Sequence, residues 1–359
     1  MKALRNFFYA FMVIIVAVGF MACSQDSDSS GDSAKIGISM PNDDSNLWVL
    51  GANTMKTKFE NAGYTVDLRY ADASADTQKE QLSAMISGGC EVLVITAEDT
   101  SSLTEVLESA KSKGVKVITY DRLILNTDAV TYYVGYNPRA VGVMQGKYIV
   151  NKLNLESDST SNVYIEFFTG KSGDNNSTQF FNGAMSVLDT YLNSRVLVCK
   201  SSETSIEKCY TAGWSTDEAK SRMAELITGY YSSDNPKVSV VYSANDGLAR
   251  GITAALKEAG YTSEDFPIIT GQDCDADSIK NIIAGYQSMS VFKDPKKLAA
   301  KTFEIVDALC QNKSTETDET VNIGETEVSA FYCEPVLVEK SNYKEILIDS
   351  GYYTEADLQ

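Results

Sequence analysis

Two short phrases rich in polar residues follow strand-like apolar runs, TYDRLI at residues 119–124 and SANDGL at residues 243–248. The first phrase places Asp121 beside Arg122 after VKVITYD, and the second places Asn245 beside Asp246 after VSVVYSAN. Carboxylates beside fixed donors suit hydroxyls, which donate and accept hydrogen bonds at once. Ligands of open parallel sheets bind beyond the carboxyl ends of the strands. Two such ends in separate halves of the chain therefore predict a cleft closed from both sides.

The elements that must position these residues alternate along the chain from residue 35 onward. Strands are expected at KIGISM, VDLRYA, EVLVITA, VKVITYD, YYVGY, NVYIEFFTG, RVLVCK, VSVVYSAN, FPIITGQD and MSVFKD. Helical patterns lie between them, at residues 48–62, 76–87, 102–113, 138–153, 176–192, 216–231, 247–259 and 295–311. Alternating strands and helices with near-continuous apolar strands indicate parallel sheets covered by helices on both faces. Two sets of about five strands predict an α/β protein with two Rossmann-like lobes.

The amino terminus has the pattern of an export signal. Lys2 and Arg5 precede an uncharged apolar stretch at residues 7–22, which is shorter than the roughly 20 residues of a membrane-spanning helix. Cys23 follows a small residue, as in the lipobox of bacterial lipoproteins, although Phe20 stands where lipoboxes prefer Leu. We expect a signal peptide at residues 1–22 and a lipidated flexible tether at residues 23–34. The alternative is an uncleaved anchor, and in both cases the protein is exported to the periplasm or cell surface.

Charge and composition exclude several functions. The formal net charge is −18, and removal of residues 1–22 takes away two basic residues and no acidic one. So acidic a protein is not expected to bind nucleic acid, or an anionic membrane other than through its lipid anchor. The chain has no histidine and no C-x-x-C pair, so no metal site and no cofactor are expected.

The cysteines other than Cys23 could pair, because export allows disulfides. Cys199 and Cys209 are separated by a short polar segment and are the first pair to test. Cys310 shares a helical face with Phe303 and Val306, which favours a buried free thiol.

Two further motifs fail on their spacing. The segment TGKSG at residues 169–173 resembles the end of a phosphate-binding loop, but the early glycine of that loop is replaced by Ile165. The aspartates at 273, 275 and 277 resemble the start of a calcium loop, whose sixth and twelfth positions are here Ser278 and Ala284. Neither nucleotide nor calcium binding is therefore predicted.

The order of KIGISMP, YDRLI, GKSGDNN, NDGL, TGQD and VFKD, together with the terminal DSGYYTEADL, resembles the periplasmic monosaccharide-binding proteins of the ribose, xylose and galactose class. Within that class it resembles in particular the multiple-sugar receptor of uptake and virulence sensing in plant-associated bacteria. The resemblance covers the mature chain. It implies the periplasmic binding protein type I fold, with two lobes joined by a three-strand hinge and a sugar clamped between them. The first lobe is expected at residues 35–139 and 294–325, and the second at residues 140–293 and 326–359.

The resemblance also implies the residues that bind the ligand. In the first lobe these are Ser45, Trp48, Asp121 and Arg122. In the second lobe they are Asp174, Asn175, Asn176, Trp214, Asn245, Asp273 and Lys293. Both tryptophans would stack on the sugar ring. Local roles compete with these assignments: Asp121 and Arg122 could form a plain ion pair, Trp214 could pack at a helix start, Asn245 could cap a helix, and Lys293 could pair with Asp294.

One departure from the relatives bears on specificity. They carry an arginine just before the first-loop tryptophan, where this chain has Leu47. Without that guanidinium, sugar acids are less favoured, and neutral hexoses or pentoses such as glucose, galactose, xylose and arabinose are expected. The function implied is delivery of the sugar to the permease of an ABC importer by a monomeric, non-enzymatic protein. The alternatives are a sensor that presents its closed form to a chemoreceptor or sensor kinase, and an enzyme on the same scaffold. A repressor is excluded by the export signal and by the missing basic helix-turn-helix.

Overall fold

The computed structural model describes residues 33–43, 45–157, 162–232, 236–315, 317, 319–324 and 326–359. Residues 34–359 form one unit. Cys23 and the expected signal peptide lie outside the described residues.

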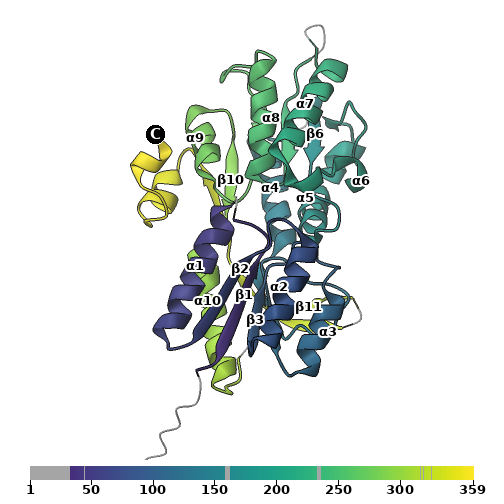
Figure 1. Cartoon of the computed structure of the whole chain (residues 1–359). Coiled ribbons are helices and arrows are strands. Elements are labelled where there is room, and N and C mark those ends of the chain that lie inside the picture. Colours follow the sequence, from purple (N-terminus) through teal and green to yellow (C-terminus); the bar gives the residue numbers. More distant parts are fainter. Residues whose placement is uncertain are drawn as a thin grey trace, which may run out of the picture. The chain divides into compact units, whose positions relative to one another are not determined.

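The first lobe is built on a seven-stranded sheet with the order β11-β12-β5-β4-β3-β1-β2 (Figure 1). Its strands are β1 (Lys35–Met40), β2 (Thr65–Tyr70), β3 (Val92–Ile95), β4 (Lys116–Tyr120), β5 (Tyr132–Tyr136), β11 (Glu319–Asn322) and β12 (Glu327–Cys333). Its helices are α1 (Asn46–Asn61), α2 (Ala75–Ser87), α3 (Thr104–Ser112) and α10 (Pro295–Cys310). Every strand pair except β11 with β12 is parallel. Every residue of β3 is buried, as expected for a parallel strand with helices on both faces.

The second lobe contains a parallel four-stranded sheet, β7-β6-β8-β9, and an antiparallel pair, β10 with β13. Its strands are β6 (Val163–Phe168), β7 (Leu197–Val198), β8 (Val240–Ser243), β9 (Ile268–Ile269), β10 (Met289–Phe292) and β13 (Val336–Glu339). Its helices are α4 (Pro138–Leu153), α5 (Asn175–Asn193), α6 (Ile206–Cys209), α7 (Thr216–Tyr230), α8 (Asp246–Glu258) and α9 (Ala276–Ala284). Short helical turns follow at η1 (Ala212–Trp214), η2 (Lys344–Ile348) and η3 (Glu355–Leu358). A bridge between Gln272 and Val291 joins β10 to the end of the four-stranded sheet. These elements confirm the expected α/β fold with mostly parallel sheets flanked by helices.

Three chain crossings connect the lobes, between β5 and α4, between β10 and α10, and between β12 and β13. The expected boundaries differ from the structure at two places. Residues 138 and 139 were expected in the first lobe, but they begin α4 of the second lobe. Residues 327–333 were expected in the second lobe, but they form β12, which pairs with β5 in the sheet of the first lobe. The chain returns to the second lobe only with β13, which pairs with β10.

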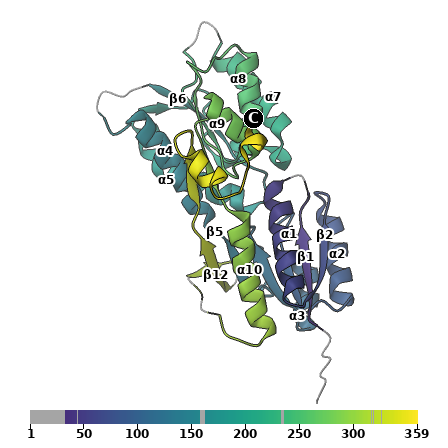
Figure 2. The same cartoon turned by 90° about the vertical axis from the view of Figure 1, so that its left-hand side faces the viewer.

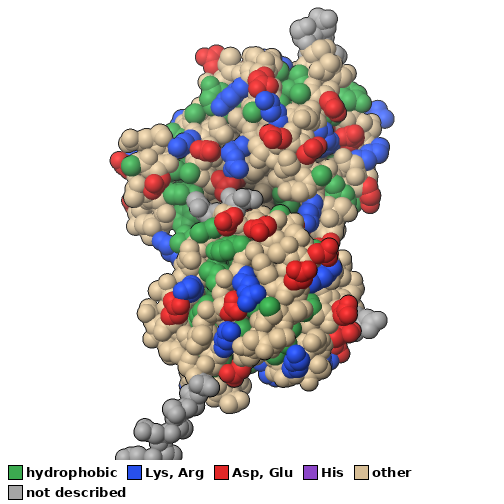
Figure 3. Space-filling model, in the orientation of Figure 1, with side chains coloured by type: hydrophobic (Ala, Val, Ile, Leu, Met, Phe, Trp, Pro, Cys, Tyr) green, Lys and Arg blue, Asp and Glu red, His purple; other side chains and the backbone are tan. Residues whose placement is uncertain are grey.

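The faces of the first-lobe sheet carry separate apolar cores. One core holds residues of α1 and α10, which lie side by side in Figure 2, and the other holds residues of α2 and α3. In the described part of the chain no disulfide bond joins two cysteines, so the half-buried Cys310 is a thiol and Cys199 and Cys209 are not bonded to each other. On the face in Figure 3, basic side chains are interspersed with acidic ones. In the residues that the structure describes, no helix combines the length and the apolar character needed to cross a membrane.

Candidate ligand-binding site

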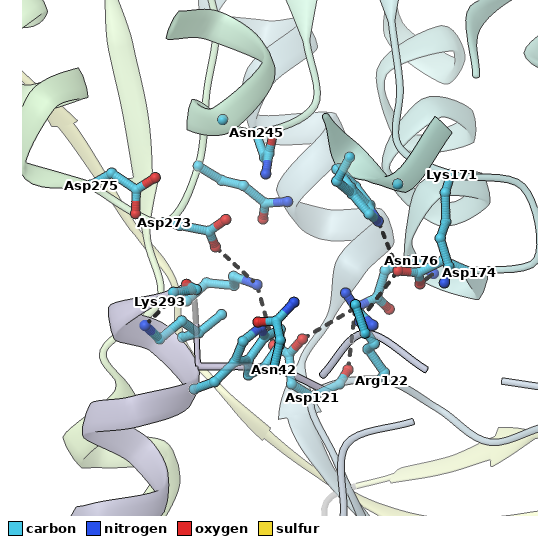
Figure 4. A pocket seen from close by; sticks show the side chains of 18 of the residues that line it. Asn42, Asp121, Arg122, Lys171, Asp174, Asn176, Asn245, Asp273, Asp275 and Lys293 are labelled. Atoms are coloured by element: carbon cyan, nitrogen blue, oxygen red, sulfur yellow. Dashed lines mark hydrogen bonds and ion pairs between the residues drawn. The ribbon is translucent and has the colours of Figure 1, made fainter. Parts of the chain in front are cut away.

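A cavity of about 610 Å³ lies between the two lobes, and Figure 4 shows its side chains. Ten of the eleven ligand-binding residues expected from the sequence line it. Those from the first lobe are Ser45, Trp48, Asp121 and Arg122, and those from the second are Asp174, Asn176, Trp214, Asn245, Asp273 and Lys293. The structure thus brings together residues that lie more than 240 positions apart in the sequence.

Asn175 is the expected residue that does not line this cavity. It lines a separate cavity of about 280 Å³ beside Tyr133 and Gln179. The reason is helical geometry: Asp174 caps α5 and Asn176 is its second residue, and successive residues of a helix point about 100° apart. The side chains on either side of Asn175 therefore face the main cavity, while its own side chain faces away.

The ends of strands and the starts of helices position the polar side chains. Asp121 follows β4 directly, and its backbone nitrogen donates to Val134 O at 2.8 Å. Asn245 follows β8 and caps α8 by accepting from Leu248 N at 3.0 Å. The expected capping role of Asn245 and its place in the cavity are therefore both present. Asp121 and Asp273 adopt φ angles of 59° and 93°, in the left-handed region. Such backbone strain costs roughly 1–3 kcal/mol and concentrates at functional sites.

Lys293 forms the centre of the buried charge in the cavity. Its Nζ lies 3.2 Å from Asp121 Oδ1 and 3.3 Å from Asp273 Oδ1. Burial lowers the pKa of Lys293, but the two carboxylates outweigh that effect and raise it. Burial raises the pKa of Asp273, and the positive charge of Lys293 offsets this only in part. The ammonium therefore stays charged at neutral pH and fixes both carboxylates. The competing role, in which Lys293 pairs with Asp294, is not among its ion pairs.

Arg122 extends the charge network toward the first-lobe loops. Its Nε lies 3.3 Å from Asp174 Oδ2, and one of its terminal nitrogens lies 3.6 Å from Glu98 Oε2. The same terminal nitrogen donates to Ala97 O at 3.0 Å. The guanidinium also lies over the ring of Trp48, 5.3 Å from its centroid. Arg122 is thus held in one orientation by contacts to both lobes.

Aromatic rings form the apolar part of the cavity. Trp48 comes from the first lobe, while Trp214 and Phe180 come from the second and meet edge to face, 6.4 Å apart. The indole nitrogen of Trp214 donates to Asp174 Oδ2 at 3.1 Å. A Cβ at Gly170 would lie 2.0 Å from the Trp214 ring, so only glycine fits there. These rings present apolar surface beside the carboxylates and amides.

Asn176 Oδ1 and Gln272 Oε1 are buried at the cavity without a hydrogen-bond partner or an ion pair. A buried unpaired acceptor costs about 1–3 kcal/mol, which a ligand hydroxyl would recover. The cavity therefore offers acceptors that match the donors of a polyol.

Asp246 has a different role from the one its position in SANDGL suggested. Its carboxylate is fully buried and accepts hydrogen bonds from the Ser290 hydroxyl, the Gln287 amide and the Asp275 backbone. Burial and the neighbouring carboxylates of Asp275 and Asp273 raise the pKa of Asp246. Asp246 thus fixes the framework of the site instead of binding a hydroxyl.

Several residues of the cavity were not expected from the sequence: Asn42, Glu98, Lys171, Arg250, Gln272 and Asp275. Glu98 lies in the loop after β3, three residues beyond the end of the strand, so the expectation that ligands bind beyond the carboxyl ends of parallel strands could have found it. Lys171 belongs to the TGKSG and GKSGDNN motifs, but neither motif assigned a role to the lysine itself. Arg250 forms an ion pair with Asp275, and no sequence pattern linked them. Throughout the described residues, no group of three or more potential ligand side chains could hold a metal ion.

Comparisons with known proteins agree with this geometry. A family profile described as periplasmic binding protein domain matches residues 36–314. The chain is 40% identical to the multiple sugar-binding periplasmic protein SbpA of Azospirillum brasilense, over 96% of this chain and 97% of that protein. It is 39% identical to the multiple sugar-binding periplasmic receptor ChvE of Rhizobium radiobacter, over 92% and 94%. It also resembles the crystal structure of an ABC transporter solute binding protein from Clostridium phytofermentans with bound β-D-glucose. That likeness has a TM-score of 0.87 and 44% identity, over 90% of this chain and 100% of the other.

Proposed function

The chain belongs to the family of periplasmic binding proteins, and on that premise we propose that it binds a neutral monosaccharide between its lobes and delivers it to an ABC importer. The resemblance to sugar-binding relatives over nearly their whole length supports the ligand class. The glucose-bound relative supports a hexose in particular. The relatives are named as binding proteins, which favours binding without turnover.

The observation that carries the proposal is the contribution of both lobes to one charged cluster. Lys293 contacts Asp121 of the first lobe and Asp273 of the second. Each carboxylate keeps further acceptor capacity for ligand hydroxyls, since an ionised carboxylate accepts at about four positions. Hydrogen bonds to charged groups contribute about 1.5–3 kcal/mol each. A few such bonds reach the roughly −8 kcal/mol of a micromolar complex.

A neutral sugar fits the charge balance better than a sugar acid. Each basic side chain of the cavity is already paired with a carboxylate: Lys293 with Asp121 and Asp273, Arg122 with Asp174, Lys171 with Glu98, and Arg250 with Asp275. An incoming carboxylate would have to displace one of these partners. Leu47, which also lines the cavity, adds no positive charge.

The test is a panel of monosaccharides measured on the purified protein. A ligand that binds only the folded state raises the melting temperature by mass action. At a ligand concentration of one hundred times Kd, the folded state is stabilised by about 2.7 kcal/mol. D-glucose, D-galactose, D-xylose and L-arabinose should raise it, while D-galacturonate at the same concentration should raise it less. Calorimetric titration of the best sugar then gives Kd and stoichiometry. A panel in which no neutral sugar shifts the melting temperature would contradict the proposal.

We further propose that Cys23 carries a lipid that holds the exported protein at the membrane. Cys23 lies outside the described residues, so this proposal rests on the sequence pattern alone. A lipid anchor keeps the binding protein close to its importer, which raises its effective concentration there.

A further inference from the structure

The TGKSG segment at residues 169–173 connects β6 to α5 and faces the loop after β3 of the first lobe. Two direct contacts join the loops. Lys171 Nζ lies 2.6 Å from Glu98 Oε1, and the hydroxyl of Thr100 donates to Gly173 O at 2.8 Å. We propose that these four residues, the interlobe clasp, hold the lobes closed over the ligand and set the rate at which the ligand dissociates. This inference rests on the proposed sugar-binding function.

The ion pair of the clasp is largely buried, so solvent weakens it only slightly. The side chains of Lys171 and Glu98 are 20% and 11% exposed. Charges that are largely withdrawn from water are screened less by salt than surface pairs. The pair therefore contributes more to closure than a typical exposed ion pair of the same length.

Hydrogen bonds to the buried side chain of Gln78 hold the first-lobe half of the clasp rigid. The backbone nitrogen of Glu98 donates to Gln78 Oε1 at 2.8 Å, and Gln78 is fully buried. Gln78 in turn donates to Ser39 and to Thr96 O. A loop fixed in this way loses little entropy when the second lobe arrives.

The second-lobe half depends on glycine. Gly173 has a φ of +86°, in the region that other residues rarely adopt, and it presents its carbonyl to Thr100. Lys171 is two residues earlier and reaches Glu98 from the same loop.

The clasp is linked to the ligand site through Glu98. Its Oε1 contacts Lys171, while its Oε2 lies 3.6 Å from Arg122. Arg122 is paired with Asp174, directly after the clasp loop. Glu98 is thus a positioning residue, which orients Arg122 and joins the lobes at the same time.

Contacts that exist only when the lobes are together favour the closed state whatever the ligand. Weakening them should speed opening by the same factor for each sugar. Direct contacts with the sugar behave differently, because their loss depends on which hydroxyls a sugar carries. This difference separates a clasp from an additional ligand-binding residue.

The chain provides its own reporter of dissociation. Its only tryptophans, Trp48 and Trp214, both line the cavity. Stopped-flow fluorescence of the full protein with D-glucose and with D-xylose measures the dissociation rate of each sugar. The variants are Lys171→Met, Glu98→Gln and their combination.

Each single variant should raise both dissociation rates by roughly fivefold, the effect of an ion pair of about 1 kcal/mol. The combination should exceed the single variants by less than twofold, since both remove the same contact. The control is Lys220→Met, which removes a Lys–Glu pair of 2.7 Å within the second lobe, and it should leave the rates unchanged.

Two results would contradict the proposed role of the clasp and leave the proposed sugar-binding function intact. The first is sugar binding by wild type with unchanged dissociation rates in Lys171→Met and Glu98→Gln. The second is a change that differs severalfold between glucose and xylose, which would make Lys171 a direct sugar contact. If wild type shows no fluorescence response to any sugar of the panel, the proposed function fails, and the clasp fails with it.

Discussion

Lys293 Nζ lies 3.2 Å from Asp121 Oδ1, although the two residues are 172 positions apart and belong to different lobes. Asp121 follows β4 of the first sheet, and Lys293 follows β10 of the second lobe. Both side chains are about 4% exposed, so the pair is withdrawn from water. Removing one member of a buried pair leaves the other charge uncompensated, which is more costly than losing a surface contact.

We expect Asp121→Asn to weaken binding of the best neutral sugar by about 2 kcal/mol, or roughly thirtyfold in Kd. The amide keeps the shape of the carboxylate but loses its charge and one acceptor, so Lys293 retains only Asp273. Calorimetric titration measures the change. Asp128→Asn is the matched control, because that carboxylate pairs with Lys111 at the surface, and its Kd should equal that of wild type. Equal affinity in Asp121→Asn and wild type would place the ligand elsewhere.

The pKa of Asp273 predicts how affinity depends on pH. Because burial raises this pKa above 3.8, the carboxyl takes up a proton at a higher pH than an ordinary aspartate does. Sugar affinity should therefore be constant near neutral pH and fall on acidification through the raised pKa, where Asp273 stops accepting from Lys293. Acidification has the opposite effect on folding stability, which the raised pKa of Asp273 increases at low pH. The folded state binds this proton more readily than the unfolded state, so the stabilisation is complete below the unfolded pKa and is lost as the pH rises.

Titrations of wild type and Asp273→Asn between pH 4.5 and pH 8 test this dependence. The variant should bind about tenfold more weakly at neutral pH, since it lacks the charged acceptor. Its affinity should also change less on acidification. Parallel pH profiles for the two proteins would assign the dependence to another group.

Position 47 should control discrimination between neutral and acidic sugars. Leu47 lines the cavity beside Trp48 and is 5% exposed. Leu47→Arg would add a guanidinium that is not already paired, and charge-assisted bonds to a carboxylate are among the strongest in proteins. The ratio of galacturonate affinity to galactose affinity should rise about tenfold. Leu47→Met is the uncharged control, and a ratio that rises equally in both variants would rule out an electrostatic cause.

The sequence predicted the strand-end residues because their placement is local. Asp121 and Asn245 follow apolar runs that could only be buried strands, and parallel strands bring their carboxyl ends to one edge. The same reasoning placed most helices within two residues of their observed bounds, for example 138–153 for α4. Asn175 lies outside the main cavity because the helix turns neighbouring residues apart, whereas a motif assigns them together.

Direct contacts between the loops of the two lobes could not be predicted from the sequence. Lys171 and Glu98 meet only because two loops 73 positions apart face each other when the lobes are together, and no local periodicity records that distance. The hairpin of β11 and β12 was missed for a related reason. The short edge strand β11 is polar and exposed, so it lacks the apolar run that marks the buried strands.

The lipid anchor makes a separate prediction. Wild type expressed in a bacterial host should incorporate radiolabelled palmitate and fractionate with the membrane. Cys23→Ser should lose the label and either keep its signal peptide or appear in the soluble fraction. Cys333→Ser controls for the loss of an arbitrary thiol, because that cysteine lies within the folded lobes. Wild type that is exported without label and without membrane association would contradict the anchor.

We also expect the lobes to close on the ligand, because the residues of the site are divided between the two lobes. Asp121 and Arg122 come from the first lobe, whereas Asn245 and Asp273 come from the second, so one sugar can contact all of them only when the lobes are together. A ligand shifts the balance between open and closed forms by its difference in affinity for the two. Hinge bending about the three crossings is the expected motion.

Small-angle scattering should therefore give a smaller radius of gyration with saturating sugar than without it. Asp273→Ala should lower both the affinity and the fraction of closed protein, because it removes a second-lobe partner of Lys293. Lys220→Met should behave as wild type, since its pair with Glu258 lies within one lobe. Tight binding with an unchanged scattering curve would mean that the site is complete without closure. Delivery to the importer would then have to depend on something other than the joining of the two lobes.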